Sequence, residues 1–152
     1  MNNQPGLMAR ALKLLAQREH SRLELQTKLA EHAPTPDVLT SLLDSLEQRN
    51  LLSDERAVEQ ILHSRRKRYG SRRIVFELQE KGIADHLIAA ALEDLKATEF
   101  SSAQAIWSKK FGVAPASHAE RGKQERYLAG RGFSFDVIGQ VLIKAEKTRH
   151  QD

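Results

Sequence analysis

The chain has 152 residues, of which 40% are hydrophobic and 29% charged, so it can bury a core and does not have the composition of a disordered protein. It contains no Cys, which excludes disulfides, thiolate metal sites and cysteine nucleophiles. The first residues lack the apolar stretch of a signal peptide, and no apolar run approaches the roughly 18 residues that a membrane span needs. We therefore expect a cytoplasmic protein with no membrane partner.

Apolar residues recur at helical spacing along almost the whole chain, and alternating strand patterns are nearly absent. The first predicted helix covers about residues 7–17. Ser21 and Glu24 have the spacing of a capping box, in which each side chain satisfies an orphan backbone amide, and they predict the start of a second helix. Thr35 followed by Pro36 provides a cap and a first-turn proline for a third helix.

In the middle of the chain, Ser53 or Asp54 is expected to begin the fourth helix. Gly70 suits the left-handed residue that would end this helix. Ser71 is then placed to cap a fifth helix, which should end at Gly82. These signals predict a helix, a glycine turn and a second helix in direct succession.

The last four predicted helices continue the same pattern. The sixth is centred on apolar residues within 87–92. Ser101 and Ser117 are each followed three residues later by Gln or Glu, so they are expected to cap the seventh and eighth helices, and Ser134 the ninth. The sequence therefore predicts an all-α fold of about nine helices.

The predicted helices are related by an internal repeat. A shift of 50 residues aligns Leu78 with Leu128 and Gly82 with Gly132, and it keeps the residue class at the positions that follow. A unit of about 50 residues is too small to bury much apolar surface alone, so neighbouring units must pack on one another. We expect three tandem three-helix repeats that form an elongated, curved array.

These repeats define the expected domains. We expect a disordered N-terminal tail over residues 1–6, repeats over 7–52, 53–98 and 99–147, and a C-terminal tail over 148–152. The second repeat contains a basic cluster. The sequence has no heptad repeat of apolar residues that would pair with a helix of a second chain, so we expect a monomer.

The positive charge of the chain is concentrated in this cluster. The chain has 24 Lys and Arg against 20 Asp and Glu, and without the six basic residues between 64 and 73 the balance is 18 against 20. The six are Arg65, Arg66, Lys67, Arg68, Arg72 and Arg73. Cations in the last turn of a helix are favourable, but Arg72 and Arg73 would stand in a first turn, against the helix dipole. With exposed N-terminal amides they would form an anion site, the alternative being a solvated face.

No pattern of catalytic or metal-binding residues is present. The six His residues are scattered singly, without the spacing of a zinc site, and no phosphate-binding glycine loop occurs. Trp107 and Phe111 are four residues apart and could form a base-stacking platform, although core packing is the more ordinary use. We expect no enzyme activity, no cofactor and no metal.

The chain resembles the RecX family in an ordered set of short motifs that covers about residues 7–142. The motifs are Arg18-Glu19-His20-Ser21, Glu24-Leu25, Lys28-Leu29, Leu52-Ser53-Asp54-Glu55-Arg56, Ser64-Arg65, Tyr69-Gly70-Ser71-Arg72-Arg73-Ile74, Glu77-Leu78-Gln79-Glu80-Lys81-Gly82-Ile83, Tyr127-Leu128, Gly132-Phe133 and Asp136-Val137-Ile138. Two positions depart from the family pattern. Ala57 replaces an aromatic residue and Ala84 a serine, which should weaken a core contact and a helix cap.

The resemblance implies a non-enzymatic regulatory protein that binds the recombinase RecA, both as a monomer and as a filament that holds single- or double-stranded DNA. Family members lie along the filament groove and inhibit ATP hydrolysis, strand exchange and coprotease activity, in recombination, DNA repair and the SOS response. The six basic residues would then contact the filament or its DNA.

Without the family resemblance, the residues alone leave two alternative functions open. A free-standing helical module could grip DNA or RNA phosphates through the cluster at residues 65–73 without a protein partner. A generic helical scaffold would bind neither filament nor nucleic acid. Six phosphate contacts to single-stranded DNA would give a steep fall of affinity with salt, which separates the first alternative from a filament regulator.

Overall fold

The structure, a computed structural model, describes residues 6–151 and contains nine α-helices and one 3₁₀ turn in this range. They are α1 (Leu7–Gln17), α2 (Arg22–Leu29), η1 (Ala30–His32), α3 (Pro36–Gln48), α4 (Asp54–Arg65), α5 (Ser71–Glu80), α6 (Asp85–Lys96), α7 (Glu99–Lys110), α8 (His118–Gly130) and α9 (Phe135–Gln151). The described residues contain no β-strand, so the predicted all-α fold is confirmed. The tail expected over 1–6 lies outside the described residues apart from Gly6, which stands at the start of α1.

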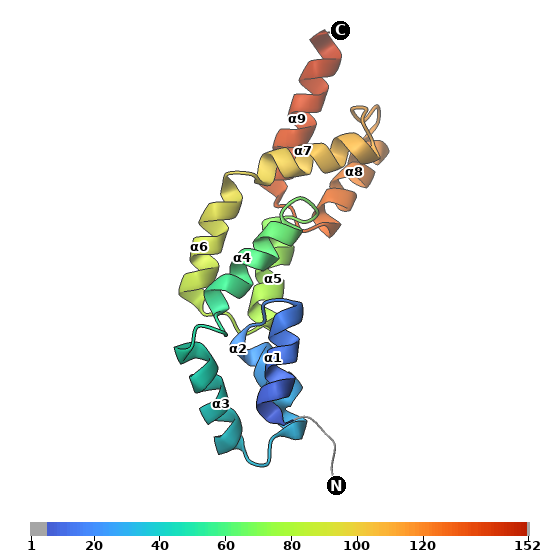
Figure 1. Cartoon of the computed structure of the whole chain (residues 1–152). Helices are drawn as coiled ribbons and strands as arrows, with labels where there is room; N and C mark the ends of the chain where they lie inside the picture. Colours follow the sequence, from blue (N-terminus) through green and yellow to red (C-terminus); the bar gives the residue numbers. More distant parts are fainter. Residues whose placement is uncertain (1–5, 152) are drawn as a thin grey trace.

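The helices form three sets that follow one another along an elongated molecule (Figure 1). Separate clusters of buried apolar side chains hold together α1 to α3, α4 to α6 and α7 to α9. Leu25, Leu78 and Leu128, one from each cluster, are completely buried. The predicted array of three tandem three-helix repeats is therefore confirmed.

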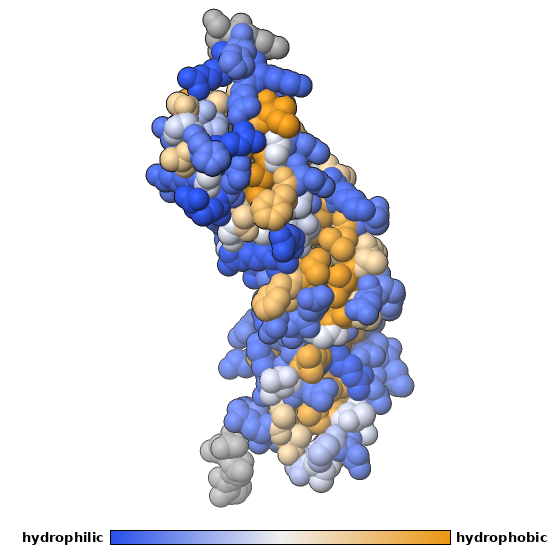
Figure 2. Space-filling model, turned by 180° about the vertical axis from the view of Figure 1, so that it is seen from behind, coloured by the Kyte–Doolittle hydropathy of each residue, from blue (hydrophilic) through white to orange (hydrophobic). Residues whose placement is uncertain are grey.

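Units of this size leave apolar side chains on the surface. Figure 2 shows them as a band along the long axis, on the face opposite to that of Figure 1. Among the large apolar residues, Phe76, Val113 and Phe135 are 62%, 68% and 74% exposed. The array thus offers apolar as well as charged surface for contacts with other macromolecules.

The repeat is visible in the backbone geometry of two helix ends. Gly82 and Gly132 both have positive φ angles, of 72° and 96°. The amide that follows each glycine donates to the carbonyl of a leucine at the end of the preceding helix, over 3.1 and 3.2 Å. A side chain is strained at such a φ, which explains why both turns contain glycine.

Successive sets are joined by the same hydrogen bond at both junctions. The amide of Arg22, the first residue of α2, donates to Oδ1 of Asp54 over 2.8 Å. The amide of Ser71, the first residue of α5, donates to Oε1 of Glu99 over 3.0 Å. Asp54 and Glu99 are themselves the first residues of α4 and α7. Each carboxylate therefore neutralises the start of a helix in the preceding set.

A second contact repeats beside the first. Ser21 and Gly70 stand at the N-caps of α2 and α5. The hydroxyl of Ser21 donates to the carbonyl of Lys81 over 2.6 Å, and the amide of Gly70 donates to that of Arg131 over 2.8 Å. Each acceptor directly precedes Gly82 or Gly132, so the junction itself is a repeated structural element.

Some predicted helix boundaries are wrong. Gly70 has an extended conformation with φ −82° and does not end α4 as a left-handed residue; it is the N-cap of α5, and Ser71 is the first helical residue. The seventh helix begins at Glu99 with Thr98 as its N-cap, one turn before the predicted Ser101. Neither helix has a side-chain cap of its own, and their first residues, Ser71 and Glu99, are hydrogen-bonded to each other between the sets.

The C-terminal helix α9 extends to Gln151, beyond the expected start of a tail at 148. No Gly or Pro follows Gly139 in this segment, so nothing in the sequence interrupts the helical hydrogen bonds. The unit boundaries at 7–52, 53–98 and 99–147 stay a proposal.

Candidate binding surface

The basic cluster lies where the second and third sets of helices meet (Figure 1). Backbone contacts backbone at this point, because a Cβ added to Gly70 would lie 2.4 Å from the carbonyl carbon and oxygen of Gly132. Only glycine fits such an approach. It brings the start of α5 against the turn between α8 and α9, so residues far apart in sequence share one surface.

The first amides of α5 already have acceptors. Ser71 donates from its amide and its hydroxyl to Oε1 of Glu99, over 3.0 and 2.9 Å. The amide of Arg72 donates to the carbonyl of Gly132 over 3.1 Å. The expected anion site of exposed amides with Arg72 and Arg73 is therefore wrong, since a carboxylate of this chain occupies it. The arginine side chains, and not the helix-start amides, are left to meet an external anion.

Two of the six predicted contact residues form ion pairs within the chain. Nε of Arg65 donates to Oε1 of Glu77 over 3.0 Å, and Nη2 of Arg66 lies 3.1 Å from Oδ2 of Asp94. Burial disfavours the charged form of Glu77, but hydrogen bonds from Lys81 and Arg65 outweigh it and lower the pKa of this carboxyl. The two arginines join α4 to α5 and α6.

The other four predicted residues present their charge to solvent. Lys67, Arg68 and Arg72 are exposed. The guanidinium of Arg73 lies over the ring of Tyr69, 4.0 Å from its centroid. Among the described residues, none of the four has a carboxylate within ion-pair distance. The structure thus separates the predicted cluster into a structural pair and an outward-facing group.

The structure adds two cations from the third set of helices. Arg131 lies 5.5 Å from the ring centroid of Tyr69 and 5.6 Å from that of Tyr127, and its Nη2 donates to the Tyr127 hydroxyl over 3.2 Å. Nζ of Lys110 lies 5.2 Å from the centroid of Tyr127. Arg73 and these residues form a row in which cations and rings alternate. We define the cationic seam as this row with its neighbours: Lys67, Arg68, Tyr69, Arg72, Arg73, Lys110, Tyr127 and Arg131.

Sequence reasoning missed the part of the seam that the third set contributes. The repeat contains one signal for it, since the shift of 50 residues pairs Arg131 with Lys81, directly before the paired glycines. Lys110 carries no such signal. It reaches Tyr127 only because α7 packs against α8 in the folded chain.

The seam has the chemistry of an anion-binding surface. A cation over a ring face is attracted to the ring and keeps its charge for other contacts. The hydrogen bond from Arg131 also lowers the pKa of the Tyr127 hydroxyl. Guanidinium groups bind phosphates and carboxylates through paired hydrogen bonds. The row therefore suits an extended polyanion or an acidic protein surface.

The base-stacking platform suggested by Trp107 and Phe111 is not formed. Trp107 is 8% exposed, and its Nε1 donates to Oε1 of the buried Gln124 over 2.8 Å, so the indole belongs to the core of the third set. In the part of the chain that the structure describes, no three His, Asp or Glu side chains are grouped to hold a metal ion. No helix in residues 6–151 has the length and apolar character to cross a membrane.

Comparisons with known proteins agree with this architecture. Two family models match, the second three-helix domain of RecX over residues 53–92 and the third over 97–142. The regulatory protein RecX of Leptothrix cholodnii is 43% identical over 99% of this chain and 98% of its own length. That of Herbaspirillum seropedicae is 48% identical over 92% of this chain and 91% of its own length.

A solved structure extends the agreement to the fold. The crystal structure of RecX from Lactobacillus salivarius superimposes with a TM-score of 0.80 and covers 92% of this chain and 94% of its own, at 19% identity. The sequence relatives and the family models together establish the family. This chain belongs to the RecX family of regulatory proteins.

Proposed function

We propose that this chain binds RecA and its nucleoprotein filament and inhibits their ATP hydrolysis, strand exchange and coprotease activity. It would act in the cytoplasm as a non-enzymatic regulator of recombination, DNA repair and the SOS response. The observation that carries the proposal is the cationic seam, whose six cations have no carboxylate partner among the described residues. Membership in a family of regulatory proteins supports it.

The shape of the molecule suits a filament partner. A three-unit array lies naturally along a groove and can contact more than one filament subunit. The seam would then meet DNA phosphates or acidic side chains of the recombinase, and the exposed apolar residues would add contacts beside it. Arg65 and Arg66 would act indirectly, by holding α4 against its neighbours.

The test is the single-strand-dependent ATPase of RecA, measured with increasing amounts of the protein. The double variant Arg73→Ala with Arg131→Ala removes two seam cations, and we expect inhibition to need about tenfold more protein. Arg49→Ala removes an exposed cation from the first set and should leave inhibition unchanged. Circular dichroism checks that both variants are folded.

Two outcomes would contradict parts of the proposal separately. Unchanged inhibition by the folded double variant would remove the seam from the contact surface. A wild-type protein that has no effect on the ATPase over a wide concentration range would remove RecA as the target.

The same cations also fit direct binding of nucleic acid without a protein partner. If all six contacted phosphates of single-stranded DNA, log affinity would fall with log salt concentration at a slope of roughly −4, at about −0.7 per contact. A shallow slope together with tight binding to the filament would favour the regulator. A steep slope and equal affinity for naked DNA would favour the nucleic-acid-binding module.

A further inference from the structure

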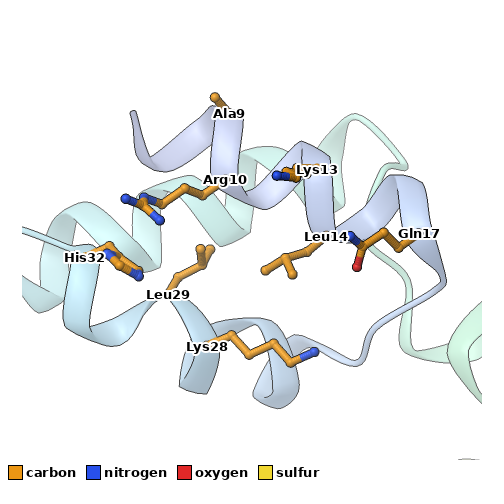
Figure 3. Close-up of a pocket in the computed structure, with 8 residues that line it drawn as sticks. All are labelled: Ala9, Arg10, Lys13, Leu14, Gln17, Lys28, Leu29 and His32. Carbon is orange, nitrogen blue, oxygen red and sulfur yellow. The ribbon is translucent and has the colours of Figure 1, made fainter. Parts of the chain in front are cut away.

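A second basic feature lies in the first set of helices, in a groove of about 390 Å³ between α1 and α2. Basic residues surround an aliphatic floor in this groove: Arg10, Lys13, Lys28 and His32 around Leu14 and Leu29. Figure 3 shows Leu14 and Leu29 between the two helices, with Arg10 and His32 at the same end. The groove therefore combines an apolar floor with a cationic rim.

The positive charge of this rim is not neutralised by nearby acids. Among the described residues, neither Arg10 nor Lys13 has a carboxylate within ion-pair distance. Nζ of Lys28 lies 3.0 Å from Nε2 of His20. A ring nitrogen that accepts from an ammonium group is uncharged, so His20 does not neutralise the charge of Lys28. His32 is different, because its Nε2 lies 3.4 Å from a carboxylate oxygen of Glu31. Three cations thus face the groove with their full charge.

The grooves of the second set have the opposite charge. The grooves between α4 and α6 are lined by Glu55, Glu59 and Asp94. The basic residues in their lining are His63 and Arg66, and Arg66 is already paired with Asp94. The cationic rim between α1 and α2 is therefore a local property of this groove, since these other grooves of the array carry acids.

We propose that the α1–α2 groove binds an acidic amphipathic segment of a partner protein. Aliphatic side chains of the segment would pack on Leu14 and Leu29, and its carboxylates would pair with Arg10, Lys13 and Lys28. Helices that carry apolar and acidic residues on adjoining faces have this chemistry. The site is separate from the cationic seam and does not depend on the function proposed for it.

The lining of the groove favours this occupant over single-stranded nucleic acid. Single-stranded nucleic acid usually stacks its bases on aromatic rings, and no Phe, Tyr or Trp is among the described residues that line the groove. An acidic segment satisfies the floor and the rim together.

The experiment measures fluorescence anisotropy of a labelled synthetic helical peptide with Leu and Glu on adjoining faces, and of a labelled oligothymidine. We expect Arg10→Glu with Lys13→Glu to weaken peptide binding about tenfold or more, because both charges are reversed at the rim. Arg10→Gln with Lys13→Gln should give a smaller loss and serves if the reversed variant does not fold. Arg49→Glu is the matched control and should keep the affinity within about twofold.

The apolar floor is tested from the peptide side, without changing the core of the protein. A peptide in which Ser replaces Leu should bind more weakly than the original. Equal peptide affinity in wild type and both groove variants would overturn the proposal, as would no peptide binding by the wild type. Loss of oligothymidine binding to the same degree would assign the groove to nucleic acid. If sedimentation shows a dimer of the wild type that dissociates in the groove variants, the groove would be assigned to a second copy.

Discussion

The backbone amide of Ser71 donates to Oε1 of Glu99 over 3.0 Å, and through this bond the third set of helices neutralises the start of a helix in the second. The amide of Arg22 makes the same bond to Asp54 over 2.8 Å, between the first and second sets. Because Glu99 already binds the start of α5, Arg72 has no part in an anion site built on the helix amides. Its side chain is left available for contacts with a partner.

Removal of either junction carboxylate should destabilise the protein. We expect Glu99→Ala and Asp54→Ala each to lower the free energy of unfolding by about 1–2 kcal/mol, because each leaves a helix-start amide without its acceptor. Urea denaturation followed by circular dichroism measures the loss. Glu80→Ala removes an exposed acid at the end of α5 and should change stability by less than about 0.5 kcal/mol.

The junction prediction also has an internal check. In a double-mutant cycle, Ser71→Ala removes the hydroxyl donor to Glu99, and its effect should shrink once Glu99 is already alanine. Additive effects of the two substitutions would show that the contact contributes nothing as a pair.

Close backbone contact at Gly70 predicts a second effect. Gly70→Ala should destabilise by about 2–3 kcal/mol, because the new Cβ would lie 2.4 Å from backbone atoms of Gly132 and the two sets would have to separate. The φ of −82° suits alanine, so the cost is purely steric. Gly139→Ala is the matched control: nothing lies within 4 Å of its Cβ and it is inside α9, so about 0.5–1 kcal/mol of stabilisation is expected. Equal effects of the two substitutions would contradict the tight junction.

Helix starts were predictable wherever a side chain of the same helix acts as the cap. Five predicted caps accept a hydrogen bond from an amide of the first turn: Ser21, Thr35, Ser53, Ser117 and Ser134. Ala84 makes no side-chain cap at the start of α6, as its departure from the family pattern predicted. The starts of α5 and α7 could not be found in this way, because their N-caps, Gly70 and Thr98, make no side-chain cap hydrogen bond.

The candidate surface was only partly predictable from the sequence. Arg72 and Arg73 are visible as neighbours in the sequence, but the acids that pair with Arg65 and Arg66 are identified only by packing. A count of charges along the sequence therefore overstates the number of cations in the cluster that face solvent, and it omits Arg131. Local patterns identify charge, and tertiary contacts decide which charges face solvent.

Buried His20 predicts a dependence of stability on pH. His20 is 1% exposed, its Nδ1 lies 3.0 Å from the carbonyl of Arg18, and its Nε2 accepts from Lys28. Burial is the largest cause that lowers its pKa below 6.5, and the charges of Arg18 and Lys28 add to it, against the opposing effects of the Arg18 carbonyl and Glu24. The folded state thus favours neutral His20, and the unfolded chain binds the proton more readily.

The sign of the effect follows from this difference. Stability is complete above about pH 6.5 and falls as the pH is lowered toward the folded-state pKa, by at most about 1.4 kcal/mol per pH unit for one group. We expect His20→Gln to reduce this acid-side slope in urea denaturation at a series of pH values. His118→Gln changes an exposed histidine at the start of α8 and should keep the wild-type slope. An unchanged slope in His20→Gln would show that another group is responsible.

Substitution of Tyr69 tests whether binding by the seam depends on its arrangement of rings and cations or on its charge alone. The ring lies under Arg73 at 4.0 Å and beside Arg131 at 5.5 Å, so Tyr69→Leu should release both guanidiniums while the net charge stays the same. Each cation–ring contact is worth about 0.5–1 kcal/mol at an exposed site, and we expect RecA inhibition to need about fivefold more protein. Tyr69→Phe keeps the ring and should inhibit as the wild type does. If Tyr69→Leu also inhibits as well as the wild type, charge alone accounts for the seam, and the alternating order of rings and cations has no role in binding.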